Sequence, residues 1–329
     1  DSLSDVPEGT PVLIRGDVDA KPGDAIGKGD IRLRSMQETL ACGRERGWKQ
    51  VIFGHIGRKP EGSLDKVAQR LGELLSIDVP LIDDWWDESA QQVPDSVAEK
   101  ICSAAPGSVL VLQNTRKYEI ARVLWKAGPD DLPSLADLLA AFANQGAEKI
   151  ATVYVHEALS AGSLDASSTV VPAAMQRVAL GKYIASEFEG PMRECLETQL
   201  VVFSGLKIDK LDDLEAMISR GKIRRVFAAG SLAMALRKAI SQIDGQECCI
   251  GAAEDPAHRD QPYYIPAERI DQAKAMVEEG RAKGIQFVVP VDSIIEDGSA
   301  VDVLKPTDQQ FDIGPKSSAL FEEKVGEFL

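Results

Sequence analysis

Short apolar runs alternate with amphipathic stretches along the first half of the chain. The apolar runs cover residues 11–18, 50–55, 108–114 and 150–157, and the first three are rich in Val, Ile and Leu and bounded by Gly, Pro or Asn. Such runs are typical of strands that are buried on both faces of a parallel sheet. The stretches between them, at residues 32–47, 63–76, 87–104 and 133–146, have the pattern of helices. Strand, helix and strand in this order predict right-handed crossovers and an α/β domain.

The pattern changes near residue 172 and then starts again. One long helix is predicted over residues 172–188, closed by Glu-Gly-Pro at 189–191. In the second half, strands are predicted at 199–205, 224–230 and 285–292, and helices at 207–220, 231–243, 267–283 and 317–328. A chain of 329 residues exceeds the size at which one core usually keeps growing. We therefore expect two lobes with parallel sheets flanked by helices, at residues 1–171 and 191–329, joined by a connecting helix at 172–190.

The charge and hydropathy of the chain exclude several classes of partner. The chain carries 37 Lys and Arg residues against 52 Asp and Glu residues, a formal net charge of −15. A protein this acidic repels polyanions at long range, so we expect no nucleic-acid partner. No apolar stretch approaches 18 residues and nothing resembles a signal peptide, so we expect no membrane insertion and no secretion.

The cysteines favour a particular compartment. There are five of them, an odd number without metal-ligand spacing, which fits a reducing, cytoplasmic environment. Because the chain begins with Asp1 rather than Met, an organelle reached through a removed targeting segment stays open. We expect a monomer. The adjacent Trp85 and Trp86 are expected to pack at the surface or at an interface.

Four arginines lie on or just beyond strand-like runs in the first 120 residues. They are Arg15, Arg32, Arg58 and Arg116. In open α/β sheets, ligands bind beyond the carboxyl ends of the strands. Guanidinium groups gathered there would form a pocket for a phosphate or a carboxylate, because each offers a planar fork of donors. The alternative is that each arginine is a solvated surface residue or an ion-pair partner.

Several well-known catalytic motifs do not occur in the sequence. There is no GxxxxGK[ST] phosphate loop, no GxGxxG after the first strand and no GxSxG elbow. Only three histidines are present and they form no His/Cys metal cluster. The arginines therefore remain the strongest chemical signal, and they indicate a small phosphorylated acid as ligand.

Five segments occur in a particular order along the chain. They are RGDVDAKP at 15–22, DIRLR at 30–34, GHIGRKP at 54–60, SGLKIDK at 204–210 and FDIGPKS at 311–317. In this order they resemble the phosphoglycerate kinase family, whose chains carry R-x-D-x-N-x-P, R-I-R, S-H-L-G-R-P, G-G-A-K-V-x-D-K and D-I-G-P-K-T. The segments VLVLQNTR and YVHEA strengthen the match. The resemblance implies two Rossmann-like lobes and reversible phosphoryl transfer between ATP and the carboxylate of 3-phosphoglycerate, in glycolysis, gluconeogenesis or carbon fixation.

Carried onto this sequence residue by residue, the resemblance implies an acid-substrate site in the first lobe. Its residues would be Asp17, Val18, Asp19, Arg32, His55, Ile56, Gly57, Arg58 and Arg116. Asp17 and Asp19 would bind the glycerate hydroxyl and carboxylate region. Arg58 and Arg116 would hold the distant phosphate. Arg32 would lie against the phosphoryl group in transfer, where cations around the equatorial oxygens are needed.

The resemblance also implies a nucleotide site in the second lobe, formed by Lys207, Lys210 and Gly230. The catalytic residues would be Arg32, Lys207 and Lys210. The nucleotide would bind as Mg-ATP or Mg-ADP, with the Mg²⁺ held by the nucleotide and by no protein ligand. Lys207 and Lys210 could alternatively form an exposed helix face.

The acid-site residues also allow structural interpretations. Asp17 and Asp19 could cap the turn that ends the first strand, and His55 could be a packing residue. Asp19 replaces an asparagine of the family, and its carboxylate would oppose an anionic substrate unless it is protonated or paired.

Other positions depart from the family pattern. Leu164 stands where a phosphate-binding arginine belongs, Ser163 and Ala166 replace histidines, and His156 and Glu157 stand for Asn and Asp. Losing that arginine removes one clamp on the substrate phosphate. A kinase for another small acid is therefore a further possibility.

The nucleotide side departs further. Lys207 and Lys210 are three residues apart where the family spaces them by four, and Ala228 and Ala229 replace glycines that approach the nucleotide. The family's N-G-P-M-G and G-G-D-T segments do not follow FDIGPKS, so the second lobe is expected to be truncated or the sequence incomplete. The alternative function is a catalytically degraded homologue that serves as a binding or structural subunit, with other proteins as partners.

Overall fold

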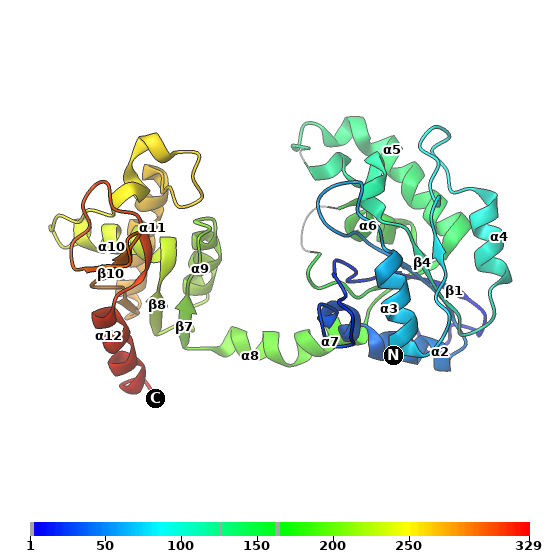
Figure 1. Cartoon of the computed structure of the whole chain (residues 1–329), viewed down its shortest axis with the longest axis horizontal. Helices are drawn as coiled ribbons and strands as arrows, with labels where there is room; N and C mark the ends of the chain where they lie inside the picture. The colour runs from blue at the N-terminus through cyan, green and yellow to red at the C-terminus, as the bar shows by residue number, and fades with distance from the viewer. Residues whose placement is uncertain (1–2, 126, 162–164) are drawn as a thin grey trace. The chain divides into compact units, whose positions relative to one another are not determined.

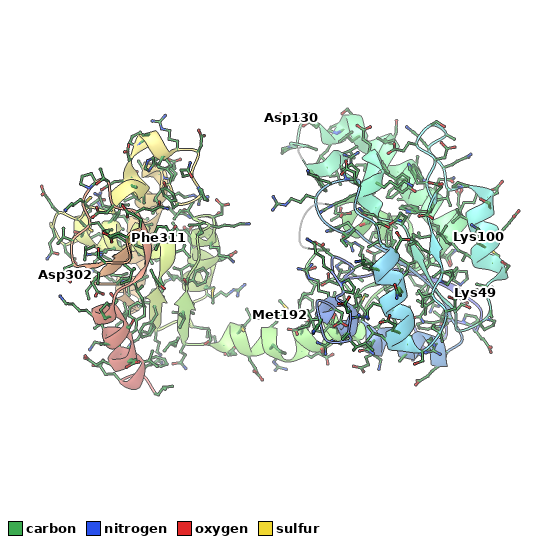
Figure 2. All side chains as sticks on the ribbon, in the orientation of Figure 1. Lys49, Lys100, Asp130, Met192, Asp302 and Phe311 are labelled. Atoms are coloured by element: carbon green, nitrogen blue, oxygen red, sulfur yellow. The ribbon has the colours of Figure 1, made fainter. Side chains whose placement is uncertain are left out.

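The chain folds into two compact units in a computed structural model that describes residues 3–125, 127–161 and 165–329. The units are Asp1–Met192 and Arg193–Leu329 (Figure 1). Their boundary lies within helix α8 (Pro191–Glu197). Figure 2 shows the side chains of each unit and labels Met192 at this boundary. In the part of the chain that is described, no helix combines the length and the apolar character needed to span a bilayer.

Six parallel strands form the sheet of the first unit, in the order β3-β4-β2-β1-β5-β6. Their bounds are β1 Pro11–Arg15, β2 Lys49–Phe53, β3 Leu81–Ile82, β4 Val109–Leu112, β5 Val153–His156 and β6 Arg177–Leu180. The four strands predicted from apolar runs in this half are confirmed, each somewhat shorter than the run. The central strand β1 pairs with β2 on one side and β5 on the other.

Helices flank both faces of this sheet. They are α1 Ile31–Ser35, α2 Gln37–Glu45, α3 Asp65–Leu75, α4 Asp95–Ser103, α5 Leu132–Gln145, α6 Ala166–Thr169 and α7 Lys182–Glu189. Short helical turns complete the unit: η1 Thr115–Lys117, η2 Glu119–Ala121, η3 Val123–Trp125 and η5 Val171–Ala174, with a π-helical turn η4 at Gly146–Ile150.

Alternate residues of β1 enter two separate cores. Val12 and Ile14 pack in a cluster with Leu40 and Leu71 from α2 and α3, whereas Leu13 belongs to a second cluster with Phe142 from α5. Because successive side chains of a strand point to opposite faces, both faces of this sheet are buried. The α/β fold class predicted from the apolar runs is confirmed.

The two adjacent tryptophans lie in the core, and the expectation of surface or interface packing is wrong. Trp85 and Trp86 are 2% and 5% exposed. The indole N–H of Trp85 donates to Gln113 O at 2.7 Å, and the ring of Trp86 lies edge-on to Phe142 with centroids 5.0 Å apart. The acidic residues beside the pair favoured a surface position, but a buried indole with a partner for its N–H costs little.

The single helix predicted over residues 172–188 and used as the connector at 172–190 is also wrong. Within that range, η5 ends at Ala174, β6 adds an edge strand beside β5, and α7 begins only after Gly181. Pro172 lies in the first turn of η5. The open edge of β5 supplies backbone hydrogen bonds to the extended segment RVAL, and these outweigh its helical pattern.

The second unit has two small sheets. β7 Leu200–Phe203, β8 Arg225–Ala228 and β9 Gln286–Val288 are parallel, and β10 Ser293–Ile295, β11 Ala300–Val301 and β12 Gln310–Ile313 form an antiparallel sheet in the order β11-β10-β12. The helices are α9 Lys210–Ser219, α10 Gly230–Ile243, α11 Ala267–Ala282 and α12 Pro315–Gly326, with turns η6 Gly251–Glu254 and η7 Pro256–His258. All four predicted helices and all three predicted strands occur; the antiparallel sheet was not predicted.

Candidate functional site

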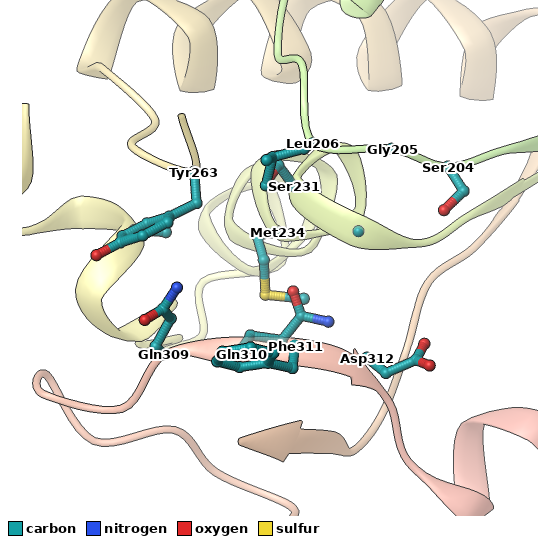
Figure 3. A pocket seen from close by; sticks show the side chains of 12 residues that line it. Ser204, Gly205, Leu206, Ser231, Met234, Tyr263, Gln309, Gln310, Phe311 and Asp312 are labelled. Carbon is teal, nitrogen blue, oxygen red and sulfur yellow. The ribbon is translucent and has the colours of Figure 1, made fainter. Parts of the chain in front are cut away.

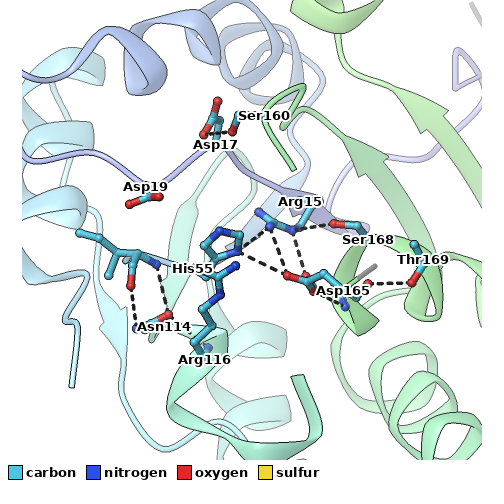
Figure 4. Close-up of polar contacts among 12 residues, drawn as sticks. Arg15, Asp17, Asp19, His55, Asn114, Arg116, Ser160, Asp165, Ser168 and Thr169 are labelled. Carbon is cyan, nitrogen blue, oxygen red and sulfur yellow. Dashed lines mark hydrogen bonds and ion pairs between the residues drawn. The ribbon is translucent and has the colours of Figure 1, made fainter. Parts of the chain in front are cut away.

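Four neighbouring parallel strands end at one edge of the first unit's sheet, and the candidate site lies in the loops that follow them. In the order β4, β2, β1 and β5, these loops carry Arg116, then His55 and Arg58, then Asp17 and Asp19, and then Ser160 and Asp165. Figure 4 shows Asp17, Asp19, His55, Arg116, Ser160 and Asp165 near one another on their separate loops. Ligands of open α/β sheets bind at such an edge.

Arg32 comes to this edge from α1 and contacts two carboxylates. Its Nη1 lies 3.4 Å from Asp17 Oδ1 and 3.8 Å from Asp19 Oδ2, and its side chain is 42% exposed. Ser160 Oγ, from the loop after β5, donates to Asp17 Oδ1 at 2.8 Å. Arg32 is therefore held in place by acids and still faces solvent, where a ligand can reach it.

Asp19 and Asn114 fix the loop that follows β2. The backbone N–H of Gly57 donates to Asp19 Oδ1 at 3.0 Å. Asn114 Oδ1 accepts the N–H of Ile56 at 3.2 Å, and its Nδ2 donates to Gly62 O at 2.8 Å. Since Asp19 pairs with both Arg32 and this loop, its carboxylate is compensated inside the protein.

Arg116 lies beside the same loop. Its Nη1 donates to Gly57 O, and its guanidinium carbon lies 4.4 Å from the centre of the Trp125 ring. Partial burial lowers the pKa of Arg116, although the Asp165 and Asp19 charges oppose that shift. Arg58 is exposed, and it forms no hydrogen bond or ion pair within residues 3–125, 127–161 and 165–329. Arg58 is thus available to a ligand.

Arg15 is buried, so it does not join an open cluster of four arginines as expected. It is 1% exposed, and its Nε donates to Ser167 Oγ at 2.9 Å and to Ser168 Oγ at 3.1 Å. Its Nη1 donates to Gly16 O at 2.7 Å, and its Nη2 lies 3.8 Å from Asp165 Oδ2. The ion-pair alternative left open from the sequence holds for this residue.

His55 contacts both Arg15 and Asp165 (Figure 4). Its Nδ1 is 3.0 Å from Arg15 Nη2 and 3.4 Å from Asp165 Oδ2. Asp165 is 1% exposed. Burial alone would raise the pKa of Asp165, but the hydrogen bond from His55, the Arg15 charge and the bonds from Ser167 together lower it to about 2.

The low pKa of Asp165 predicts an acid-side loss of stability in the first unit. Because the folded pKa is below the ordinary value of 3.8, the stabilisation is complete above about pH 4 and is lost as pH falls through about 2. The total is about 2 kcal/mol. All four tryptophans lie in the first unit, so urea unfolding followed by tryptophan fluorescence from pH 6 to pH 2 isolates it. Asp165→Asn should remove this component; an unchanged pH slope in the variant would contradict the assignment.

The two residues that replace the family's Asn and Asp have structural roles. Glu157 is fully buried, and its Oε1 accepts Thr39 Oγ1 at 2.6 Å and the N–H of Tyr183 at 3.1 Å. Burial raises the pKa of Glu157, against the hydrogen bond from Thr39. His156 is stacked on Tyr154, and burial lowers its pKa.

Some of the positions discussed from the sequence are buried or lie outside the described residues. Val18 is 1% exposed and packs in the core, so only its backbone can reach a ligand. Ala166 is buried in α6. Ser163 and Leu164 lie outside the described residues.

A cavity of 240 Å³ lies in the second unit. Residues from the loop after β7, from α10 and from β12 line it, together with Ala253 and Tyr263 (Figure 3). Gly230 has φ +64°, and a Cβ there would lie 2.5 Å from Gly205 O. Because these two glycine segments are in close contact, no side chain fits at Gly230, and this wall of the cavity is formed by backbone.

The expected nucleotide lysines flank this region. Lys207 is exposed and directly follows Leu206, which lines the cavity. Lys210 begins α9, and its Nζ lies 3.9 Å from Asp213 Oδ2. The methyl group of Ala228, which replaces a family glycine, packs in the hydrophobic core of the unit.

Sequence reasoning missed Asp165, Ser160 and Asn114 as site residues. Asp165 and Ser160 lie in the segment that was discussed only for the family residues that it replaces. The signal for Asp165 was present, because Asp is a favoured helix N-cap residue, and here the Asp165 carboxylate accepts the N–H of Ser167.

Comparison with known proteins identifies what the chain is similar to. The model of the family described as phosphoglycerate kinase matches residues 3–328. The phosphoglycerate kinase of Bifidobacterium adolescentis is 27% identical, over 97% of this chain and 76% of that protein, and the one of Finegoldia magna is 25% identical, over 95% and 74%.

Solved structures show the same fold. The phosphoglycerate kinase of Coxiella burnetii has a TM-score of 0.65 at 23% identity, covering 98% of this chain and 76% of its own. The one of Pyrococcus horikoshii has a TM-score of 0.70 at 21% identity, covering 98% and 77%.

Proposed function

We propose, from the premise that this chain belongs to the phosphoglycerate kinase family, that it catalyses reversible phosphoryl transfer between ATP and the carboxylate of 3-phosphoglycerate. The observation that carries the proposal is the gathering of His55 and Arg116 at the carboxyl ends of the strands (Figure 4), with Arg32 against Asp17 and Asp19 and with Arg58 close enough to Arg116 to affect its charge. Those side chains suit an anion with a charge at each end.

In the proposed reaction, a carboxylate oxygen of the acid attacks the γ-phosphorus of ATP. A new P–O bond forms, the bond to the β,γ-bridging oxygen breaks, and ADP leaves with that electron pair. Arg32 would face charge on the moving phosphoryl group; its place at the site edge and its 42% side-chain exposure support this role. Such a transfer needs positioning and cations more than covalent help.

Arg58 and Arg116 would hold the distant phosphate. Asp17 and Asp19 would contact the hydroxyl and carboxylate region, with His55 and the backbone of Val18, Ile56 and Gly57 completing the acid site. Lys207 and Lys210 would take the remaining catalytic roles. These roles rest on the match of each residue to the family motif.

The cavity of the second unit would take the nucleotide, with Gly230 at its wall. Its 240 Å³, its exposed Phe311 side chain and its partly buried Tyr263 ring suit a flat base. Mg²⁺ would enter as part of the substrate Mg-ATP. The described residues contain no group of three or more His, Cys, Asp or Glu side chains arranged to hold a metal ion, so the nucleotide phosphates would carry it.

We further propose that the protein acts in the cytoplasm as a monomer on these small molecules, in glycolysis or its reverse or in carbon fixation. The net charge of −15 disfavours nucleic acid and anionic membranes as partners.

A coupled assay that detects ADP tests the function. We expect ADP formation that requires both ATP and 3-phosphoglycerate, and calorimetry should detect each ligand in the micromolar to millimolar range. Binding of both ligands without turnover would refute the kinase activity. Turnover with a different small acid from a substrate panel would redirect the proposal to that acid, and silence toward both ligands would favour a binding or structural subunit.

A further inference from the structure

We propose that Asn114 is a positioning residue that holds the loop at residues 54–62 against turn η1. Its role is to set the spacing of Arg58 and Arg116, which lie on that loop and on that turn. This inference rests on the proposed function for the identity of the ligand, because these two arginines are the ones proposed to hold the distant phosphate. The hydrogen bonds behind it belong to the free protein.

The Asn114 side chain uses its whole hydrogen-bonding capacity on the backbone of these two segments. Oδ1 accepts the N–H of Ile56 and the N–H of Arg116, each at 3.2 Å. Nδ2 donates to Gly62 O at 2.8 Å and to Ile56 O at 3.3 Å. A carboxamide has two donors and an oxygen with two acceptor sites, so nothing is left unpaired. Asn114 is 0% exposed, so water does not compete for these four bonds, which we call the Asn114 clamp.

The clamp requires a carboxamide. Turning the Asn114 amide over would place its oxygen against two carbonyl oxygens and its nitrogen against two N–H donors, so the partners determine its orientation. A carboxylate of the same size would face the carbonyls of Ile56 and Gly62 without a proton to donate. Loss of the two donors therefore opens the loop side of the clamp and leaves buried carbonyls unpaired.

One contact shows what the clamp does for the groups that face the ligand. Arg116 Nη1 donates to Gly57 O, so the arginine side chain of the turn lies on the backbone of the loop. Gly57 lies between Ile56 and Arg58 in the sequence. The bonds from Asn114 to Ile56 therefore keep Gly57 O within reach of the guanidinium. They also fix the backbone position of Arg58.

The clamp acts against the repulsion of two like charges. Partial burial is the main cause that lowers the pKa of Arg116, and the nearby Arg58 charge adds to that shift. The two guanidiniums therefore repel each other until an anion binds. Neutral hydrogen bonds that hold their backbones in place let a phosphate meet both cations without first drawing the two segments together. Loss of the clamp is therefore expected to weaken acid binding.

NMR of the asparagine side chains tests the clamp without any ligand. The sequence has only two asparagines, Asn114 and Asn144, and Asn144 is exposed on α5. Protein labelled on asparagine should give two side-chain amide signals, and Asn144→Ser identifies the exposed one. We expect the Asn114 amide to exchange its protons with water at least 100-fold more slowly than the Asn144 amide, a factor on the order of those seen for buried bonds. Similar exchange rates for the two amides would refute the clamp.

The affinity for 3-phosphoglycerate tests the effect on the ligand. Asn114→Asp keeps the size of the side chain and removes both donors, and it should weaken binding about tenfold. We expect kcat at saturating acid to stay within about threefold, because Arg32 lies on neither segment. Calorimetry measures the affinity and steady-state kinetics measures kcat. An affinity within about twofold of the wild-type value, or a loss in kcat alone, would contradict the proposal.

Gln50→Met is the matched control for the loss of a buried carboxamide. Gln50 is also 0% exposed, but it lies in β2 and its Nε2 donates to Leu40 O of α2 at 2.9 Å. The change should lower the free energy of unfolding of the first unit and leave the affinity for 3-phosphoglycerate within about twofold. A loss of affinity equal to that of Asn114→Asp would mean that lost stability alone weakens binding, and the proposal would be wrong.

A double-mutant cycle shows whether Asn114 acts through the arginine. In the Arg116→Met background, Asn114→Asp should weaken binding less than about threefold. Equal losses in both backgrounds would overturn the proposal. If Asn114→Asp does not fold, Gly62→Ala replaces it, because a Cβ at residue 62 would lie 3.1 Å from Asn114 Nδ2 and 2.8 Å from Ile56 O. That change should also weaken binding, and an unchanged affinity would count against the clamp.

The two kinds of measurement separate this inference from the proposed function. If the wild-type protein binds no 3-phosphoglycerate, the proposed function fails, and with it the role of the clamp in binding that acid. The exchange rate of the Asn114 amide still shows whether the clamp exists in the free protein. If the acid binds and the Asn114 amide exchanges as fast as that of Asn144, the proposed function stands and the clamp is refuted.

Discussion

Replacing Arg32 with Ala lowers kcat about 10³-fold and changes the KM for 3-phosphoglycerate less than about threefold. The reason is that a guanidinium facing the moving phosphoryl group stabilises charge that develops mainly in the transition state. In the free protein Arg32 is already held by Asp17 and Asp19, at 3.4 and 3.8 Å, so the ground-state site loses little when it is removed. Steady-state kinetics with each substrate varied gives kcat and KM separately.

Arg34→Ala is the matched control for this change. Arg34 lies on the same helix α1, has the same 42% side-chain exposure, and pairs with Asp30 away from the site edge. Its replacement should leave kcat within about twofold of the wild-type value. Equal losses in kcat and in acid affinity for Arg32→Ala would mean that Arg32 is a binding residue only.

Arg15→Met destabilises the first unit by about 3–5 kcal/mol. The substitution leaves Asp165 as a buried charge without its nearest cation and removes the donors that satisfy Ser167, Ser168 and Gly16. Breaking one member of a buried pair is costly for this reason. Urea unfolding followed by tryptophan fluorescence measures the loss in the free energy of unfolding of the first unit alone, where all four tryptophans lie.

Arg58→Met provides the opposite case. Arg58 is exposed, so its loss should change the free energy of unfolding by less than about 0.5 kcal/mol while weakening binding of the acid. If the free energy of unfolding of Arg15→Met lies within about 1 kcal/mol of the wild-type value, the buried network contributes little to stability. Arg15 is then not the structural residue described above.

Much of the fold was predictable because apolar patterning carries it. Runs such as residues 50–55 and 108–114 are long enough and apolar enough to indicate buried strands, and β2 and β4 occupy them. The strand at residues 177–180 was not predicted, because an edge strand is exposed on much of its surface. Its RVAL sequence fits a helix as well as a strand, and only pairing with β5 decides between them.

The site was predictable where a residue lies in a motif directly after a strand. Asp17, His55 and Arg116 could be found in that way, and the structure brings their loops to one edge. Whether such a residue faces the ligand or the core depends on partners far away in sequence. Arg15 is the example: its partners Ser167 and Asp165 are about 150 residues distant, and no local pattern connects them.

These long separations determine when the acid site comes into existence as the chain folds. Arg15 meets Ser167 across 152 residues, and Thr39 meets Glu157 across 118. Closing such loops costs entropy before any contact rewards it, and parallel strands cannot pair until the crossover between them is made. A nascent chain would therefore hold β1, β2 and β4 without a working anion pocket, and would gain the pocket only when the segment around α6 docks.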